Sequence, residues 1–277
     1  MPMLPLTAGA ALHCAVDDYL WPWQCPTPVM LLHGFARNAR FWNRWVPSLA
    51  DSRRLYRPDL LGCGESETPP VGYRITAGAI AAQVIAVLDA LALERVHWVG
   101  ESSGGIVGMT AALTYPDRLS TLTLCDTPFK RSAKIASTYV LGEANRAAAF
   151  DKYGVGGWCR QTLSYRIDTT KASPELCEWY IAEMDKTPKH VAVAMDHAVA
   201  EGDLWPHLPE ISMPTLILSG AQSPIAKDDE AKAMQQRMPA AKRVAFEGFG
   251  HGVNLLAPDR CVSEVRQFLA ERKGATL

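Results

Sequence analysis

A serine at position 102 lies in residues 100–104, Gly-Glu-Ser-Ser-Gly, which fit the pattern G-x-S-x-G. The apolar residues 96–99 before it are typical of a buried strand, and residues 106–114 after it have helical periodicity. So tight a turn from strand to helix needs small neighbours and lifts the serine hydroxyl clear of the backbone. N–H groups at the start of the helix favour negative charge that develops there. The sequence therefore predicts Ser102 as a catalytic nucleophile.

A serine hydroxyl is a poor nucleophile until a base takes its proton, so a histidine is needed near Ser102. His251 stands in a glycine-rich loop, residues 247–252, after the last predicted strand, and in a parallel sheet this loop leaves from the same edge as Ser102. His33 also opens a loop at that edge, but there the backbone is better suited to supply an N–H than the imidazole a base. His97 lies within a predicted strand and is more simply a buried histidine with satisfied hydrogen bonds. We predict His251 as the general base.

The elements that must position these residues alternate along the chain between apolar strands and segments with helical periodicity. The predicted strands cover residues 29–32, 54–58, 96–99, 119–125, 215–218 and 243–246, and the predicted helices cover 77–91, 106–114, 228–238 and 259–271. This alternation predicts an α/β fold, a mostly parallel sheet with helices on its faces. From 127 to 208 the pattern breaks into about eighty mainly helical residues. We expect one core, residues 1–126 and 209–277, with a helical insertion at 127–208.

The chain resembles the α/β-hydrolase superfamily over nearly its whole length. The resemblance rests on His33-Gly34-Phe35, the segment Asp59 to Ser66, the Ser102 turn, Tyr115-Pro116-Asp117-Arg118 and Gly250-His251. It implies an eight-stranded, mostly parallel sheet flanked by helices, with a helical cap inserted after strand 6 to cover the active site. It also implies that the backbone N–H groups of Phe35 and Ser103 form the oxyanion hole for a tetrahedral intermediate.

The acid of a Ser-His-acid triad is where the sequence departs from the usual family pattern. The family commonly has Gly-x-x-Asp after the seventh strand, but residues 220–224 place Ser223 at the aspartate position. A serine cannot carry the charge that stabilises an imidazolium. Asp126 ends the sixth strand, 24 residues after Ser102, and should emerge one strand over on the same edge. The chain also resembles the resorcylic-lactone hydrolases in its Ser-Ser-Gly turn, and these place their acid there.

We therefore predict Asp126 as the orienting carboxylate, with an ordinary loop aspartate as the alternative interpretation. Asp228 and Asp229 are reserve candidates, although they precede a helical pattern and suit the first turn of a helix. Glu101 adjoins the nucleophile, yet the residue after the glycine at a strand end is expected to point away from the serine. The sequence analysis gives Glu101 no catalytic role.

Two residues are predicted to bind substrate. Asn38 lies just past the predicted oxyanion loop, and Trp158 is one of the aromatic residues of the insertion. These aromatic residues are compatible with an apolar or aromatic substrate. A small helical cap also needs them to bury its own faces, and we favour that interpretation for most of them. Trp42 begins a helix-like run and is expected in the core.

Composition excludes several other classes of protein. The 277 residues include 28 Lys and Arg against 29 Asp and Glu, a net charge of −1, so no nucleic acid or anionic membrane is expected as partner. With 48% hydrophobic and 21% charged residues, the chain is typical of soluble globular proteins. Its seven cysteines lack CxxC spacing, which favours a reducing cytoplasm. Residues 1–12 are apolar but lack the positive start of a signal peptide, so we expect the first strand region there.

Together these features predict a cofactor-independent serine hydrolase that cleaves a carboxylic ester or lactone of a small molecule through an acyl-enzyme. No cofactor or metal is expected, because the sequence has no phosphate-binding loop and no H-E-x-x-H. Two enzymatic alternatives stay open: a carbon–carbon bond hydrolase of ring-cleavage products, whose glycine-rich oxyanion loop is absent from residues 34–38, and a cofactor-free dioxygenase of the same fold. A ligand-binding receptor is a third. The sequence predicts no particular oligomeric state.

Overall fold

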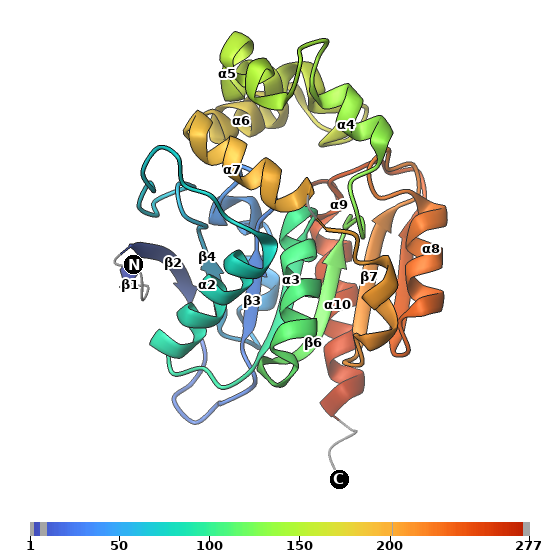
Figure 1. The fold of residues 1–277 in the computed structure, drawn as a ribbon. Helices are drawn as coiled ribbons and strands as arrows, with labels where there is room; N and C mark the ends of the chain where they lie inside the picture. Colours follow the sequence, from blue (N-terminus) through green and yellow to red (C-terminus); the bar gives the residue numbers. More distant parts are fainter. Residues whose placement is uncertain (1–2, 6–9, 201, 274–277) are drawn as a thin grey trace.

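A computed structural model describes residues 3–5, 10–200 and 202–273, and within them eight strands form one sheet (Figure 1). The strands are β1 Met3–Pro5, β2 Ala11–Asp17, β3 Val29–Leu32, β4 Leu55–Pro58, β5 Val96–Glu101, β6 Leu119–Cys125, β7 Thr215–Gly220 and β8 Ala241–Phe246. Their order across the sheet is β1-β2-β4-β3-β5-β6-β7-β8.

The parallel part of the sheet runs from β4 to β8, while β1 and β2 form an antiparallel margin. The register sets Leu32 beside Gly100 and Gly100 beside Leu124, so β3, β5 and β6 end close together. β7 and β8 continue the same direction, with Gly220 beside Phe246. The loops after these strands therefore meet at one edge, which we call the carboxyl edge.

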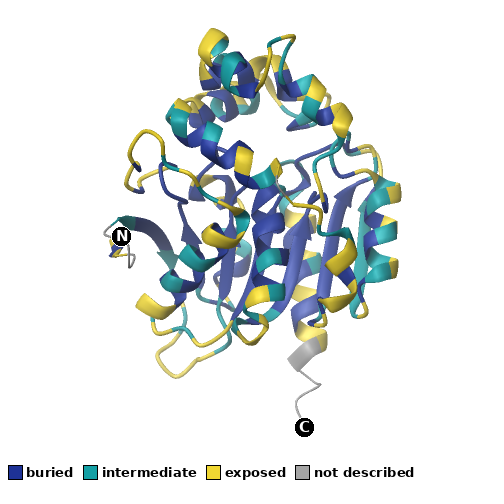
Figure 2. Ribbon diagram, in the orientation of Figure 1, coloured by how far each residue is buried: buried dark blue, intermediate teal, exposed yellow. Residues whose placement is uncertain are grey.

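Helices cover both faces of the sheet, because its strands are apolar on both sides. In the core, the α-helices are α1 Val46–Leu49, α2 Ala77–Ala90, α3 Ser103–Thr114, α8 Asp228–Arg237, α9 Val253–Leu256 and α10 Pro258–Lys273. In β3, Met30 and Leu32 share a hydrophobic cluster with α2 and α3, whereas Val29 and Leu31 share another with α10. Figure 2 shows the result: β3 to β7 are buried almost throughout, β8 is mostly intermediate, and exposed residues lie mainly on the outer sides of helices and in loops.

Between β6 and β7 the chain leaves the sheet, and residues 127–208 form a segment that we call the helical insertion. Its α-helices are α4 Ala133–Tyr139, α5 Arg146–Thr162, α6 Pro174–Asp185 and α7 Lys189–Ala200. Figure 1 shows them above the carboxyl edge of the sheet. Ser132, Asn145 and Ser173 cap α4, α5 and α6, because each side chain accepts a backbone N–H of the first turn.

Four short 3-10 segments complete the described secondary structure: η1 Ala39–Trp42, η2 Pro116–Arg118, η3 Leu163–Tyr165 and η4 Trp205–Glu210. Trp42, expected in the core, is fully buried. None of the helices in the described part of the chain is both long enough and apolar enough to span a bilayer.

The predicted fold class is confirmed, and the differences lie at the ends of elements. The helix predicted at 106–114 begins at Ser103, because Gly104 and Gly105 carry no apolar pattern that would announce a helix. The strand predicted at 243–246 begins at Ala241. The predicted first strand region, residues 1–12, contains β1 and the start of β2, while residues 1–2 and 6–9 lie outside the described residues.

Substituting Gly104→Ala should destabilise the fold at the junction of β5 and α3. A Cβ on Gly104 would lie 2.5 Å from the carbonyl oxygens of Leu32 and His33, and backbone there cannot yield. We expect a loss of about 2 kcal/mol or more in the free energy of unfolding, measured by urea denaturation. Gly78→Ala is the matched control, because Gly78 is exposed in α2 and its added methyl group would come no closer than 3.8 Å to Thr76. The control should be neutral or stabilise by up to about 1 kcal/mol, and equal effects at both sites would contradict the packing argument.

Candidate active site

Ser102 connects β5 to α3 in a strained backbone conformation, with φ 52° and ψ −117°. A positive φ at a residue with a side chain costs on the order of 1–3 kcal/mol, so the surroundings must impose it. They do so through a hydrogen bond from the Ser102 N–H to the Cys125 carbonyl oxygen at 2.9 Å and through the close approach of Gly104 to β3. Ser102 itself lines a pocket at the carboxyl edge.

Two backbone amides flank Ser102 without an acceptor among the described residues: those of Phe35 and Ser103. Ser103 is the first residue of α3, and the first N–H groups of a helix have no acceptor within it. Phe35 lies in the turn after β3, and both residues line the same pocket as Ser102. Unpaired amides in this arrangement can stabilise an oxyanion.

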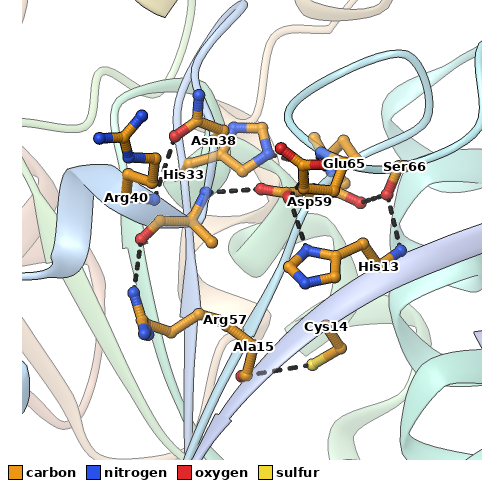
Figure 3. A network of polar contacts seen from close by, with 12 residues as sticks. His13, Cys14, Ala15, His33, Asn38, Arg40, Arg57, Asp59, Glu65 and Ser66 are labelled. Carbon is orange, nitrogen blue, oxygen red and sulfur yellow. Dashed lines mark hydrogen bonds and ion pairs between the residues drawn. The ribbon is translucent and has the colours of Figure 1, made fainter. Parts of the chain in front are cut away.

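A network around Asp59 fixes the turn that carries Phe35 (Figure 3). One carboxylate oxygen of Asp59 accepts the Ala39 N–H at 2.6 Å, and the other accepts the Glu65 N–H at 3.0 Å and lies 2.7 Å from His13 Nδ1. The loop after β4 and the turn after β3 therefore share one buried carboxylate.

His33 reinforces the same connection. Its Nε2 accepts the Leu60 N–H at 3.0 Å, so Nδ1 carries the ring proton and donates to the Gly34 carbonyl oxygen at 2.8 Å. Burial lowers the pKa of His33, which keeps the ring neutral. The ring thus has both nitrogens occupied in holding the turn and is not free to act as a base.

His251 lies in the loop after β8, is almost completely buried and lines the pocket with Ser102. Its Nδ1 is 3.1 Å from Ser223 Oγ, whereas its Nε2 has no hydrogen-bond partner in the described part of the chain. Burial lowers the pKa of His251 well below 6.5, and the charges of Arg37 and Arg166 lower it further. The ring is therefore neutral near pH 7 and has a nitrogen free to accept a proton.

Asp126 also follows the strand that the sequence indicated, and its residue is fully buried with φ 45°. Its carboxylate accepts three backbone N–H groups, from Gly220 at 2.8 Å, Gly252 at 2.7 Å and Val253 at 2.8 Å. Burial raises the pKa of Asp126 to about 7, although the three amides act in the opposite direction. The expected direct bond to the imidazole is absent among the described residues, and His251 Nδ1 lies beside Ser223 instead. Asp126 instead holds the two residues that follow His251.

Ser223, the residue found where the family pattern has an aspartate, takes the place beside His251 Nδ1. Its hydroxyl oxygen also accepts the Ala226 N–H at 3.1 Å. A hydroxyl can either accept a proton from Nδ1 or donate one to it, so it permits both neutral tautomers of the ring. A carboxylate at this position would permit only the tautomer with the proton on Nδ1, which is the one a general base requires.

Glu101 is the residue whose position the sequence analysis missed. Its side chain is 1% exposed, one carboxylate oxygen pairs with Arg37, and the other lies 3.6 Å from His251 Nε2. Burial raises the pKa of Glu101, and Arg37 opposes this effect. One residue could have indicated this position: Arg37 lies in an otherwise apolar turn, and a buried cation needs a carboxylate as its partner.

The pocket above Ser102 is small, with a volume of about 60 Å³. Apolar side chains, among them Phe35, Ile106 and Ile135, form much of its wall. Five cationic side chains line it as well: Arg37, Lys130, Arg131, Arg146 and Arg166. No acidic residue of the described chain is in its wall.

The two residues predicted to bind substrate do not belong to the wall of this pocket as the described residues form it. Asn38 is buried and donates to Glu183 of α6 at 2.8 Å, so it joins the core to the helical insertion. Trp158 is also fully buried, and its ring lies beneath Arg146 and Arg166. Neither prediction is used below, because proximity in sequence or an aromatic side chain alone did not place these residues in the wall of the pocket.

The reserve acids lie elsewhere. Asp228 and Asp229 are in the first turn of α8, where carboxylates suit the helix dipole. Asp228 pairs with Lys232 and with Arg243. Neither residue has a contact with His251 in the structure as described.

Comparisons with known proteins bear on the family and the fold. One family model, described as the alpha/beta hydrolase fold, matches residues 27–157, and a second, described as TAP-like protein, matches residues 187–274. A 3-oxoadipate enol-lactonase of Acinetobacter baylyi is 28% identical over 210 residues, which cover 73% of this chain and 74% of that protein. A 2-hydroxymuconate semialdehyde hydrolase of a Pseudomonas species is 36% identical over 100 residues, 35% of each chain. The solved structure of a thermophilic esterase from Thermogutta terrifontis, with malate bound, has a TM-score of 0.83 at 27% identity and covers 97% of both chains.

The environment of His251 predicts the pH dependence of any reaction that uses it as a base. Because its pKa is lowered, the neutral ring persists as the pH falls below 6.5, so protonation of the base itself should lower activity only below that value, while Asp126, with a pKa raised to about 7, titrates separately. Ser223→Asp would place a carboxylate beside Nδ1, raise the pKa of the ring and move the acidic limb of kcat/KM to higher pH. The measurement is kcat/KM between pH 4 and 9 for both proteins. A limb near pH 7 in the parent would report Asp126, so the result that contradicts the assignment of His251 is an acidic limb that does not move in Ser223→Asp.

Proposed function

Because the chain belongs to the α/β-hydrolase superfamily and is a hydrolase, we propose that it cleaves a carboxylic ester or lactone through an acyl-enzyme on Ser102. The observation that carries this proposal is the grouping of a strained serine, a neutral histidine with a free Nε2 and two unpaired amides around one pocket. Similarity to an enol-lactonase and an esterase supports the same bond type. The pocket's apolar wall suits a substrate with an apolar body.

In the proposed reaction Ser102 Oγ attacks the carbonyl carbon while His251 Nε2 takes the hydroxyl proton. The amides of Phe35 and Ser103 hold the negative oxygen of the tetrahedral intermediate. When that intermediate collapses, His251 returns the proton to the leaving alcohol. Water activated by His251 then attacks the acyl-enzyme, which releases the acid and restores Ser102.

Asp126 has a positioning role in this proposal. By accepting the N–H groups of Gly252 and Val253, it fixes the loop that presents His251 to Ser102. Glu101 supplies the negative charge nearest to the reacting nitrogen, 3.6 Å from Nε2. The imidazolium that forms during the reaction gains from that carboxylate, although Arg37 offsets part of its charge.

Ser102→Ala and His251→Ala should each lower kcat by about 10³-fold or more on p-nitrophenyl esters, because each removes one partner of the proton transfer. Ser137→Ala is the matched control, since Ser137 is an exposed serine of α4. Intact-protein mass spectrometry after mixing with a slow ester should detect an acyl group on the parent and none on Ser102→Ala. Full activity in Ser102→Ala would reject the nucleophile.

Asp126→Asn should lower kcat by about 10²- to 10⁴-fold. An amide cannot accept all three backbone N–H groups with its oxygen alone, so its NH₂ group would face an amide donor and displace the loop of His251. Asp228→Asn, in the first turn of α8, should stay within about threefold of the parent. Near-parental rates in Asp126→Asn, together with collapse in Asp228→Asn, would assign the acid to the loop after β7.

Similarity to the semialdehyde hydrolase makes carbon–carbon bond hydrolysis the second candidate. The turn at residues 34–38, Gly-Phe-Ala-Arg-Asn, lacks the run of glycines expected for that chemistry, which favours the ester or lactone. The two are separated by adding 2-hydroxymuconate semialdehyde to the substrate panel and following the loss of its visible absorbance. Turnover of this compound without any ester hydrolysis would favour the second candidate.

A further inference from the structure

The pocket above Ser102 contains a guanidinium without a carboxylate partner. Arg166 follows η3 in the helical insertion, is 3% exposed and lines the pocket with Ser102 and His251. Its Nε donates to Thr162 Oγ1 at 3.1 Å, and its Nη1 lies 4.0 Å from Met184 Sδ. Within the described residues, no carboxylate is within ion-pair distance of Arg166, and its Nη2 has no hydrogen-bond partner. Nη2 is also not among the polar atoms sealed from solvent. A donor of this buried arginine therefore faces the pocket.

The other cations of the pocket show how unusual this is, because each of them has an acidic partner. Arg37 pairs with Glu101, and Lys130 pairs with Asp203 at 3.0 Å. Arg131 and Arg146 both contact the same oxygen of Asp196. Three carboxylates thus serve four cations, and the fifth cation, Arg166, has none.

The position of Arg166 is set by aromatic rings. Its guanidinium carbon lies 4.0 Å from the ring centre of Trp158, 4.9 Å from that of Tyr139 and 5.4 Å from that of Phe35. Arg146 packs on the same group, 4.2 Å from the ring centres of both Phe35 and Trp158. Stacking on a ring occupies the face of a guanidinium and leaves its N–H edge available, so the fork is fixed before a ligand arrives.

Two guanidinium groups held side by side in a buried site repel one another. Burial lowers the pKa of Arg146 to about 9, with Arg166 contributing in the same direction and Asp196 opposing. A buried cation is stable only when an anion or hydrogen bonds compensate for its lost hydration. Asp196 provides this for Arg146, whereas Arg166 has only the longer-range attraction of Glu101, whose pKa it helps to lower, and no carboxylate within ion-pair distance among the described residues.

We infer that the substrate carries, besides the ester or lactone carbonyl, a free carboxylate that binds the N–H edge of Arg166. With Nε donating to Thr162 and Nη1 directed at Met184, Nη2 is the nitrogen left to donate a charge-assisted hydrogen bond to that carboxylate. The small pocket volume, about 60 Å³, keeps the carboxylate and the reacting carbonyl within one short molecule. The substrate class is then a short-chain monoester or lactone acid with an apolar stem. This inference rests on the proposed function, because it assigns the substrate of the same site.

The test compares two esters that differ only in charge, monoethyl succinate and diethyl succinate. We expect the parent to favour the monoethyl ester in kcat/KM at pH 7.5, and Arg166→Gln to lower the ratio of the two kcat/KM values by about 10- to 100-fold, mainly through KM of the anion. Arg166→Lys keeps a charge without the fork and should retain part of the preference. Arg160→Gln is the matched control, since Arg160 is an exposed arginine of α5 paired with Glu178, and it should leave the ratio unchanged.

Binding of succinate, measured by calorimetry, separates failure of this inference from failure of the proposed function. Succinate should bind the parent and Arg160→Gln and bind Arg166→Gln at least about tenfold more weakly. If esters are hydrolysed but succinate does not bind and the parent shows no preference for the anion, the inference is overturned and the hydrolase proposal stands. If no ester is hydrolysed but succinate binding depends on Arg166, the anion site stands and the proposed reaction falls.

Since Arg166→Gln can fail to fold, circular dichroism of each variant and inhibition of the parent by succinate complete the design. Absence of that inhibition would also overturn the inference.

Discussion

The buried carboxylate of Asp126 joins the ends of three strands, and the geometry of the site depends on it. Asp126 follows β6, and its two oxygens accept N–H groups from Gly220, at the end of β7, and from Gly252 and Val253, where the loop after β8 enters α9. Each of these amides would lose on the order of 1–3 kcal/mol if it were buried without an acceptor. Pairing between neighbouring parallel strands fixes where a loop leaves the sheet, but the path of the loop beyond the sheet is set by contacts such as these. The position of His251 relative to Ser102 follows from them.

The core and the helical insertion meet at the residues that form the site. The Thr187 hydroxyl donates to the Ala36 carbonyl oxygen at 3.3 Å, and Asn38 donates to Glu183 at 2.8 Å. Phe35 belongs to the same turn, and the centre of its ring lies 6.4 Å from that of Phe150 in α5. The turn after β3 therefore has two neighbours, the nucleophile below and the insertion above. The turn that carries the Phe35 amide is therefore packed directly against the helical insertion.

The sequence predicted the fold, and it located the loops that carry Ser102 and His251, because these features follow from local patterns. Periodicity located the strands and helices, and small residues around Ser102 indicated the strained turn that the structure contains. No local sequence pattern indicated which groups pair with the buried charged side chains. Asp126 was expected to bond the imidazole, but the amides of Gly252 and Val253 compete for its oxygens, and which N–H groups a loop presents depends on its tertiary path. Glu101 was expected to point away from Ser102, and its pairing with Arg37 in the turn after β3 turns it toward His251 instead.

The pocket volume of about 60 Å³ also has a kinetic meaning. Pockets that enclose small organic ligands usually measure about 300–1,000 Å³, so this one corresponds to a closed state of the molecule. A substrate larger than this volume reaches Ser102 only when the helical insertion moves away from the carboxyl edge. Motions of such segments take microseconds to milliseconds. For such a substrate, this movement is a step of turnover separate from the chemistry on Ser102.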